Sequence, residues 1–594
     1  MKIARMAEVD FTSLTSGRTY TPSPAAWEDQ VFYFLMVDRF SDGKESNYRD
    51  NSGALVTDGS TPLFTLSQAS NISREQWVRN GQGWKGGNLK GMIGKLGYLQ
   101  RMGITALWVS PIFKQVNFLE TYHGYGIQNF LELDPHFGTK EELVTLVEKA
   151  HELGIYVILD IILNHTGNVF SYNPDRYPVA GTNYYDPRWD GRLYDVAGFN
   201  DAEGRPTVPF RAEATTNPDA AVFPLELQEP ATFTRKGRIN SWDYHPEFLE
   251  GDFCDLKDVR HGSGPDDHYV PSRALEVLAA AYKYWIALAD VDGFRVDTVK
   301  HMEIGATRYF ASVIHEFTQS IGKERFFLIG EITGGRSRAF NTLEQTGLDA
   351  ALGVDDIPDK LEYMVKGYRN PEDYFNLFRN STLVGKESHT WFRNKVVTLF
   401  DDHDQVRKGN RKGRFCADNE GWKVLLNVLA VNVLTLGVPC IYYGSEQYFN
   451  GHATEDRDGN DVFLRECMFG GNYGALQTKG CHFFNEESAA YVEFAKIIEV
   501  RRREIALRRG RQYLREISGD GMIFGLPRMM GGQIRSVVPW SRILDQQEVV
   551  TAINTDYNNA RTAWVTVDSG LHNLNRPFVC LYSTDGSQIG KCEP

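Results

Sequence analysis

Four near-continuous apolar runs, each ending on polar side chains, constrain the fold of this chain more than any other feature. They cover residues 155–165, 293–301, 326–331 and 396–404. Strands that are buried on both faces of a parallel sheet have such unbroken apolar sequences. In a (β/α)₈ TIM barrel the C-terminal ends of the strands meet at one face, and that face carries the active site. The runs therefore predict an α/β barrel with polar groups gathered at one end.

The segments between these runs alternate as a barrel requires. Further apolar runs that complete eight strands occur at 31–38, 104–109, 348–354 and 438–443. Helical periodicity is present at 89–102, 141–153, 273–289, 306–320, 422–436 and 489–507. Strands and helices that alternate in this way predict a parallel sheet.

Two segments depart from this alternation and predict further domains. Residues 166–271 are rich in Pro, Gly, Asp and aromatic residues, and so long an excursion is expected to form a subdomain. After about residue 510, short strands with turn signals, such as 522–526, 548–553 and 562–567, predict an antiparallel β-sandwich. We therefore expect a barrel of residues 1–165 and 272–508, an inserted domain of 166–271 and a C-terminal domain of 509–594.

The run at 293–301 places a guanidinium beside a carboxylate. Arg295 and Asp297 are two residues apart, so their side chains share one face of a strand. A fixed guanidinium favours the ionised form of a neighbouring acid, and a carboxylate nucleophile has to be ionised. On its own, this segment is equally compatible with a structural ion pair.

Together the four runs resemble the four short signatures of the α-amylase family, glycoside hydrolase family 13. The matching stretches are Asp160 to His165, Gly293 to His301, Gly330-Glu331 and His403-Asp404, in the family's order and spacing. The resemblance extends from about Trp27 to Leu507, and it places an inserted domain B after the third strand and a domain C at the end. It implies that Asp297 is the nucleophile, Glu331 the general acid/base and Asp404 a third carboxylate that binds the sugar.

The same resemblance implies a retaining hydrolase that cleaves α-1,4-glucosidic bonds in malto-oligosaccharides or related glucans. A 4-α-glucanotransferase that uses the same residues is the alternative within enzymes, and an inactive barrel that serves as a binding protein is the alternative outside them. The presence of all three acids argues against the inactive barrel. The implied sugar-binding and supporting residues are Arg295, His123, Tyr125, His165, His403, Lys300 and His301.

Calcium is the cofactor that the resemblance implies. In the family, a site between barrel and domain B uses the side chain that matches Asn164, an acid of domain B that we match to Asp255, and the backbone carbonyl that matches His301. Oxygen ligands of this kind suit calcium. A weaker second site is expected at Asp42, although Lys44 stands where a ligand would be needed and an ammonium cannot ligate a cation.

Two departures from the family pattern bear on activity. Asp402 precedes His403 where the family usually has Asn, which changes the local charge near Asp404. Residues 332–335, after Glu331, contain no aromatic where cyclodextrin-forming transferases carry one to hold a sugar acceptor. This absence favours water as the acceptor, and therefore hydrolysis.

Composition sets limits on partners and location. The 594 residues are 42% hydrophobic and 24% charged, as in soluble globular proteins of two or three domains. A net charge of −13 argues against nucleic acid and anionic membranes as partners, and it is compatible with an oligo- or polysaccharide substrate. With no apolar segment of the secretory or membrane-spanning type and seven cysteines without CxxC spacing, a cytoplasmic location with free thiols is expected. The oligomeric state stays open.

Overall fold

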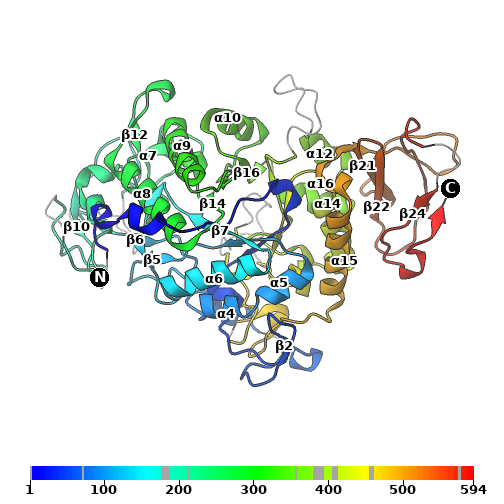
Figure 1. Cartoon of the computed structure of the whole chain (residues 1–594), viewed down its shortest axis with the longest axis horizontal. Coiled ribbons are helices and arrows are strands. Elements are labelled where there is room, and N and C mark those ends of the chain that lie inside the picture. The colour runs from blue at the N-terminus through cyan, green and yellow to red at the C-terminus, as the bar shows by residue number, and fades with distance from the viewer. Residues whose placement is uncertain are drawn as a thin grey trace.

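Eight parallel strands form a nearly closed barrel at the centre of the molecule, as predicted (Figure 1). This computed structural model describes residues 3–69, 72–174, 187–211, 215–354, 357–378, 393–404, 412–453, 461–471, 473–572 and 577–593. The barrel strands are β1 (Phe32–Leu35), β4 (Ala106–Val109), β7 (Tyr156–Ile161), β14 (Gly293–Val296), β15 (Phe327–Glu331), β16 (Ala350–Leu352), β17 (Val397–Thr398) and β18 (Val438–Tyr442). They are hydrogen-bonded in the order β16-β15-β14-β7-β4-β1-β18-β17, and a bridge between Ala351 and Val396 joins the two ends.

The helices that surround the barrel lie where periodicity predicted them, except α10 and α11, which the sequence analysis did not predict. They are α4 (Leu89–Ile93), α5 (Leu96–Met102), α6 (Lys140–Glu152), α8 (Arg273–Ala289), α9 (Ile304–Ser320), α10 (Arg336–Thr346), α11 (Ile357–Val365), α14 (Gly421–Leu434) and α15 (Ala489–Arg503). Thr139 begins α6 with a capping box, in which its hydroxyl accepts from the backbone N–H of Glu142. Gly103 ends α5 in the left-handed conformation (φ 98°), which glycine adopts without strain. No helix in the described ranges combines the length and apolar character needed to cross a bilayer.

Aromatic side chains of the barrel core lie directly beneath the polar groups at the C-terminal ends of the strands. Every residue of β1, β4 and β14 is buried, and apart from Arg295 these strands carry no charged side chain. The rings of Phe34 and Trp108 stack with centroids 3.7 Å apart, and the Phe34 ring contacts His403 edge-on at 5.0 Å. Trp108 also donates its indole N–H to Asp160 Oδ2 at 3.1 Å. The aromatic floor therefore orients polar groups that lie just above it.

The inserted segment forms a separate layer of short strands beside the barrel (Figure 1). Three antiparallel pairs join β8 (His165–Thr166) to β11 (Lys257–Asp258), β9 (Phe170–Tyr172) to β10 (Val196–Phe199), and β12 (Gly262–Ser263) to β13 (Val270–Pro271). Phe170, Phe199, Phe210 and Phe233 pack together within it. The β8–β11 pair is important for the site because it ties this segment to the end of β7.

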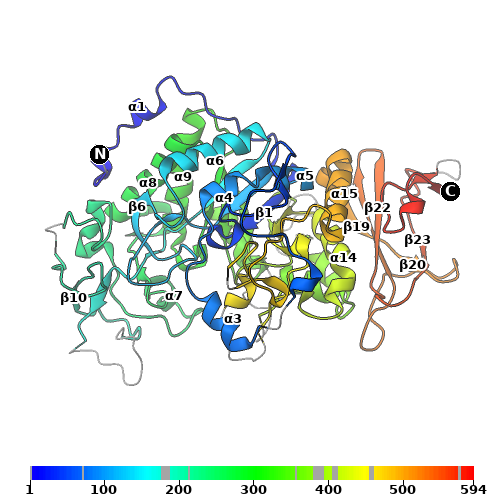
Figure 2. The same ribbon diagram turned by 90° about the horizontal axis from the view of Figure 1, so that it is seen from below.

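The C-terminal segment forms antiparallel sheets at the opposite side of the molecule (Figure 2). One sheet contains β19 (Arg511–Leu514), β21 (Val537–Leu544) and β22 (Gln547–Asn554); two pairs join β20 (Ile517–Ser518) to β23 (Trp564–Val565) and β24 (Phe578–Val579) to β25 (Cys592–Glu593). The predicted strand at 522–526 is wrong. Asp520 accepts from the backbone N–H groups of Met522 and Ile523 and makes this stretch a turn. All seven cysteines lie in the described ranges and are free thiols.

Candidate active site

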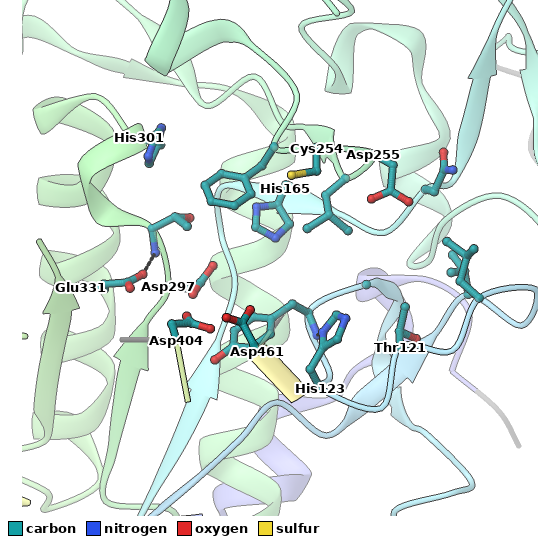
Figure 3. Close-up of a pocket in the computed structure, with 18 of the residues that line it drawn as sticks. Thr121, His123, His165, Cys254, Asp255, Asp297, His301, Glu331, Asp404 and Asp461 are labelled. Carbon is teal, nitrogen blue, oxygen red and sulfur yellow. Dashed lines mark hydrogen bonds between the residues drawn. The ribbon is translucent and has the colours of Figure 1, made fainter. Parts of the chain in front are cut away.

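A pocket of about 930 Å³ opens at the C-terminal ends of the barrel strands and extends beneath the inserted segment. The acids predicted from three separate runs, Asp297, Glu331 and Asp404, all line it (Figure 3). They follow or end β14, β15 and β17, and these strands deliver them to one face of the barrel because parallel strands share their direction. The structure therefore brings together the three acids that the sequence singled out.

One buried guanidinium bridges two of these acids and a third carboxylate. Arg295 is 1% exposed, and its Nη1 lies 2.5 Å from Asp297 Oδ1 and 3.0 Å from Asp160 Oδ1. Its Nη2 lies 3.1 Å from Glu331 Oε2, which also accepts from the backbone N–H of Thr298 at 2.9 Å. The register of β7 and β14 pairs Arg295 with Asp160, so this contact is set by the sheet itself. Arg295 does not line the main pocket; it lies beneath the acids and holds them.

The charge balance of this cluster differs from the sequence-based expectation. Burial raises the pKa of Asp297 well above its ordinary value, against the opposing effect of Arg295, and the charge of Glu331 adds to the rise. Burial likewise raises the pKa of Asp160 to about 6. Arg295 favours the ionised form of Asp297, as the sequence predicted, but three buried carboxyl groups share this one guanidinium and burial has the larger effect on the Asp297 pKa.

Asp404 is held by different partners on the other wall of the pocket. Its Oδ1 lies 2.7 Å from Arg465 Nη2, and its Oδ2 lies 3.3 Å from His403 Nε2. Asp402 accepts from the backbone N–H of Asp404 at 2.7 Å, so the Asn-to-Asp departure at this position keeps the turn intact. Burial opposes ionisation of Asp404, but His403, Arg465 and Lys412 outweigh it and lower its pKa.

Uncharged hydrogen-bonding groups surround the acids. Burial lowers the pKa of His123, His165 and His403 to about 3, so all three rings are neutral at pH 7. Tyr125 is hydrogen-bonded through its hydroxyl to Asp160 Oδ2 at 3.0 Å and to His403 Nε2 at 2.9 Å. Within the described residues, the buried Nε2 of His165 has no partner. Neutral imidazole and phenol groups both donate and accept hydrogen bonds, as recognition of sugar hydroxyls requires.

The inserted segment supplies one side of the pocket entrance. Lys300 Nζ lies 2.7 Å from Asp243 Oδ1, and His301 Nδ1 is hydrogen-bonded to the Phe248 carbonyl at 2.7 Å. Trp242 is 40% exposed, lines the pocket beside these residues and packs edge-on against the His301 ring at 5.8 Å. An accessible indole therefore lies on the wall that also carries Lys300 and His301.

Comparison with known proteins identifies the family. Residues 34–472 match the model of the α-amylase catalytic domain, which is well over half of the chain. The chain belongs to the α-amylase family. It is 26% identical to an α-amylase of Streptomyces lividans over 543 residues, which cover 85% of this chain and 54% of that protein. It is 27% identical to a cyclomaltodextrin glucanotransferase of Bacillus sp. (strain 38-2), covering 88% of this chain and 61% of that one. The chain thus spans about half to three fifths of these relatives.

The fold of a solved α-amylase agrees with this assignment. The crystal structure of the Geobacillus thermoleovorans α-amylase, complexed with acarbose, superimposes with a TM-score of 0.57 at 22% identity, covering 90% of this chain and 88% of that one. At this identity the likeness supports the fold alone. The family contains both glycoside hydrolases and transglycosylases, and the members named above represent both.

At the position where the family resemblance implies calcium, the acid beside Asn164 is Asp258 and not the Asp255 chosen from sequence. Asp255 lines the pocket, whereas the acid next to Asn164 is Asp258: the Val259 N–H donates to the Asn164 carbonyl at 2.9 Å, and β11 pairs Asp258 with His165. Asn164 Oδ1 and Asp258 Oδ2 are both buried and lack hydrogen-bond partners among the described residues. Two orphaned oxygens on paired strands fit an oxygen-seeking cation.

The weaker metal site at Asp42 gains no such support. Asp42 Oδ1 accepts from the Lys44 backbone N–H at 3.0 Å, and its Oδ2 lies 3.3 Å from Lys44 Nζ. In the same loop, Glu45 forms a fully buried ion pair with Lys95 Nζ at 2.9 Å, and this ammonium lies 3.5 Å from the centroid of the Tyr48 ring. The two acids of this loop, Asp42 and Glu45, are therefore already paired with lysine side chains. Across the described residues, no group of three or more His, Cys, Asp and Glu side chains could hold a metal.

Sequence reasoning missed Trp242, Asp258, Asp461 and Arg465, which lie in or beside the site. Trp242 and Asp258 lie in the inserted segment, where no periodicity fixes which side chains face the barrel. Asp258 follows Asp255 by three residues, so the motif alone could be aligned on either acid. Arg465 follows β18 by more than twenty residues, and no strand pattern links it to Asp404.

Proposed function

We propose that this protein is a retaining α-glucan hydrolase that cleaves α-1,4-glucosidic bonds in malto-oligosaccharides or related glucans. The observation that carries the proposal is the bridge from Arg295 to both Asp297 and Glu331 at the wall of one pocket. Two carboxyl groups beside the same bond are what double displacement requires. The names of the α-amylase and glucanotransferase relatives support an α-glucan substrate.

In the first half-reaction, Asp297 attacks the anomeric carbon while Glu331 protonates the leaving oxygen. The positive charge that develops on the sugar in the transition state favours the ionised form of Asp297. As general acid, Glu331 supplies the proton that the leaving oxygen receives, and its Oε2 lies 3.1 Å from the same guanidinium. Arg295 contacts both acids, so the same guanidinium stabilises the negative charge whether that charge lies on Asp297 or on Glu331.

In the second half-reaction, the oxygen of the incoming hydroxyl displaces Asp297 from the anomeric carbon while Glu331 accepts the proton of that hydroxyl. Two inversions at the anomeric carbon leave the product in the α configuration. Asp404 is ionised because its pKa is lowered, and it accepts hydrogen bonds from sugar hydroxyls. Neutral His123 and His165 complete the set of hydroxyl partners.

A 4-α-glucanotransferase is the second candidate, and Trp242 is the observation that favours it. The absence of an aromatic residue after Glu331 argued for water as acceptor, but the inserted segment supplies an indole on the wall beside Lys300. Aromatic rings bind the apolar faces of sugars. We therefore propose hydrolysis at low substrate concentration and an increasing share of transfer at high concentration.

Chromatography of products from maltotriose, maltoheptaose, cyclodextrin and pullulan tests this function. Hydrolysis raises the number of reducing ends with every bond cleaved, whereas transfer redistributes chain lengths at a constant number. We expect reducing ends to rise on the linear substrates. A constant number would favour the transferase, and no conversion of any α-glucan would contradict both.

We also propose a structural calcium ion held by Asn164 and Asp258, with the His301 backbone carbonyl as the further ligand implied by the family. The support is the pair of orphaned, buried oxygens on Asn164 and Asp258. Bound calcium would supply a positive charge that links the inserted segment to the end of β7. A ligand that binds only the folded state stabilises it.

Chelation of the purified protein, followed by thermal unfolding, tests the calcium proposal. We expect chelator to lower the melting temperature of the wild type and to have no effect on Asp258→Asn. Asp255→Asn is the matched control and should keep the chelator effect. Absence of calcium in elemental analysis, together with a melting temperature that does not respond to chelator, would contradict the proposal.

A further inference from the structure

Arg465 is a buried arginine whose guanidinium lies between two acids of the pocket wall. It follows the short helix of Asp461–Leu464, after β18. Its Nη2 lies 2.7 Å from Asp404 Oδ1 and 3.1 Å from Asp461 Oδ2. Asp404, Asp461 and Arg465 all line the pocket, and Figure 3 shows both acids pointing into it. One nitrogen therefore serves two carboxylates that compete for it.

The rest of the Arg465 side chain is fixed by neutral partners. Nε donates to the His403 carbonyl at 3.1 Å, and Nη1 donates to the Tyr122 hydroxyl at 3.4 Å. The Tyr122 ring is itself covered by Arg39, whose Cζ lies 3.8 Å from the ring centroid. Arg39 is fully buried and donates to the Arg465 carbonyl at 3.3 Å. The guanidinium thus keeps its place whichever carboxylate it binds.

Asp461 is bound from its other side by Lys412 Nζ. It therefore has a cation of its own and does not depend on Arg465 alone. Asp404 has no equivalent: its other partner, His403, is neutral at pH 7 because burial lowers the pKa of that imidazole to about 3. Among the cations that contact Asp404 in the described residues, Arg465 is the only one with a permanent charge.

We propose that Arg465 is a positioning residue that orients Asp404 toward the bound sugar, and that Asp461 sets how strongly it does so. A guanidinium anchored on three sides fixes the carboxylate in one rotamer, and a competing acid weakens that hold enough for Asp404 to accept hydrogen bonds from sugar hydroxyls. This inference rests on the proposed function, because it assigns Asp404 to the sugar.

Steady-state kinetics of two variants on maltoheptaose test the positioning role. Arg465→Gln removes the guanidinium that holds Asp404, so kcat should fall by about 10²-fold. Asp461→Asn removes the competing acid, so Arg465 should hold Asp404 more tightly and KM should rise. Arg465→Lys keeps the charge but loses the planar bidentate geometry, and should recover only part of kcat. Arg308→Gln on α9 removes the same charge away from the pocket and should leave kcat and KM unchanged.

A kcat in Arg465→Gln close to that of the wild type, or an unchanged KM in Asp461→Asn, would overturn the proposal. Crystal structures of the wild type and Arg465→Gln give a readout that does not depend on activity: Asp404 should leave its pocket-facing rotamer in the variant, and an unchanged rotamer would contradict the role. If the wild type converts no α-glucan, the proposed function fails while these structures still decide whether Arg465 orients Asp404.

Discussion

Replacement of Arg295 by Gln is the perturbation whose consequences follow most directly from the structure. The guanidinium contacts Asp160, Asp297 and Glu331 at 2.5 to 3.1 Å. An opposite charge at such distances lowers the pKa of an acid by about one to three units. Because Arg295 lowers the pKa of Asp297 against burial, its loss raises that pKa further. The acidic limb of the kcat/KM profile should therefore move up by about one to three pH units.

Stability should fall in parallel with activity. Removal of one partner from a buried ion pair costs about 3–5 kcal/mol of unfolding free energy. Arg295→Lys keeps the charge, but a single ammonium cannot contact three carboxyl groups at once as the planar guanidinium does. We expect this variant to recover part of the stability and little of the rate, measured by denaturant unfolding and by pH profiles on maltoheptaose. A wild-type acidic limb in folded Arg295→Gln would refute the role assigned to the shared guanidinium.

Three further predictions concern other parts of the site. Burial raises the pKa of Asp160 to about 6, against 3.8 for the ordinary group, so the stabilisation from its protonated form is present below pH 4 and is lost as the pH rises through 6. The free energy of unfolding of Asp160→Asn, measured in urea relative to the wild type, should therefore increase by about 3 kcal/mol between pH 4 and 7. A difference between the two proteins that stays constant with pH would contradict this. Trp242→Ala should lower the ratio of transfer to hydrolysis at high maltose in reducing-end counts, and an unchanged ratio would remove Trp242 from the acceptor wall. Asp297→Asn, Glu331→Gln and Asp404→Asn should each lower turnover by about 10²-fold or more with unchanged circular dichroism; near-normal turnover would reject the role of that acid.

The barrel and its acids could be predicted because they lie on strands. Apolar runs fix which residues are buried, and the acid that ends each run then points to the C-terminal face. That logic placed acids from separate runs at one face, and the resemblance to the α-amylase family then selected Asp297, Glu331 and Asp404 among them. It also located all eight strands, with differences of a few residues at their ends.

The remaining parts depend on contacts that no periodicity encodes. Arg465 reaches Asp404 from a segment after β18, and Trp242 reaches the pocket from the inserted segment. The proton balance at Asp297 could not be predicted from the pair Arg295-Asp297, because Asp160 and Glu331 share the same cation. Cytoplasmic residence and the oligomeric state are not addressed by the fold, so the location stays a prediction.

The stereochemistry of the first product tests the central claim most directly. The account requires two inversions, one when Asp297 attacks the sugar and one when Glu331 activates the acceptor. Proton NMR of maltoheptaose cleavage, recorded before mutarotation, should show the α anomer alone at the new reducing end. A β anomer in the earliest spectra would contradict the covalent mechanism and the roles of both acids.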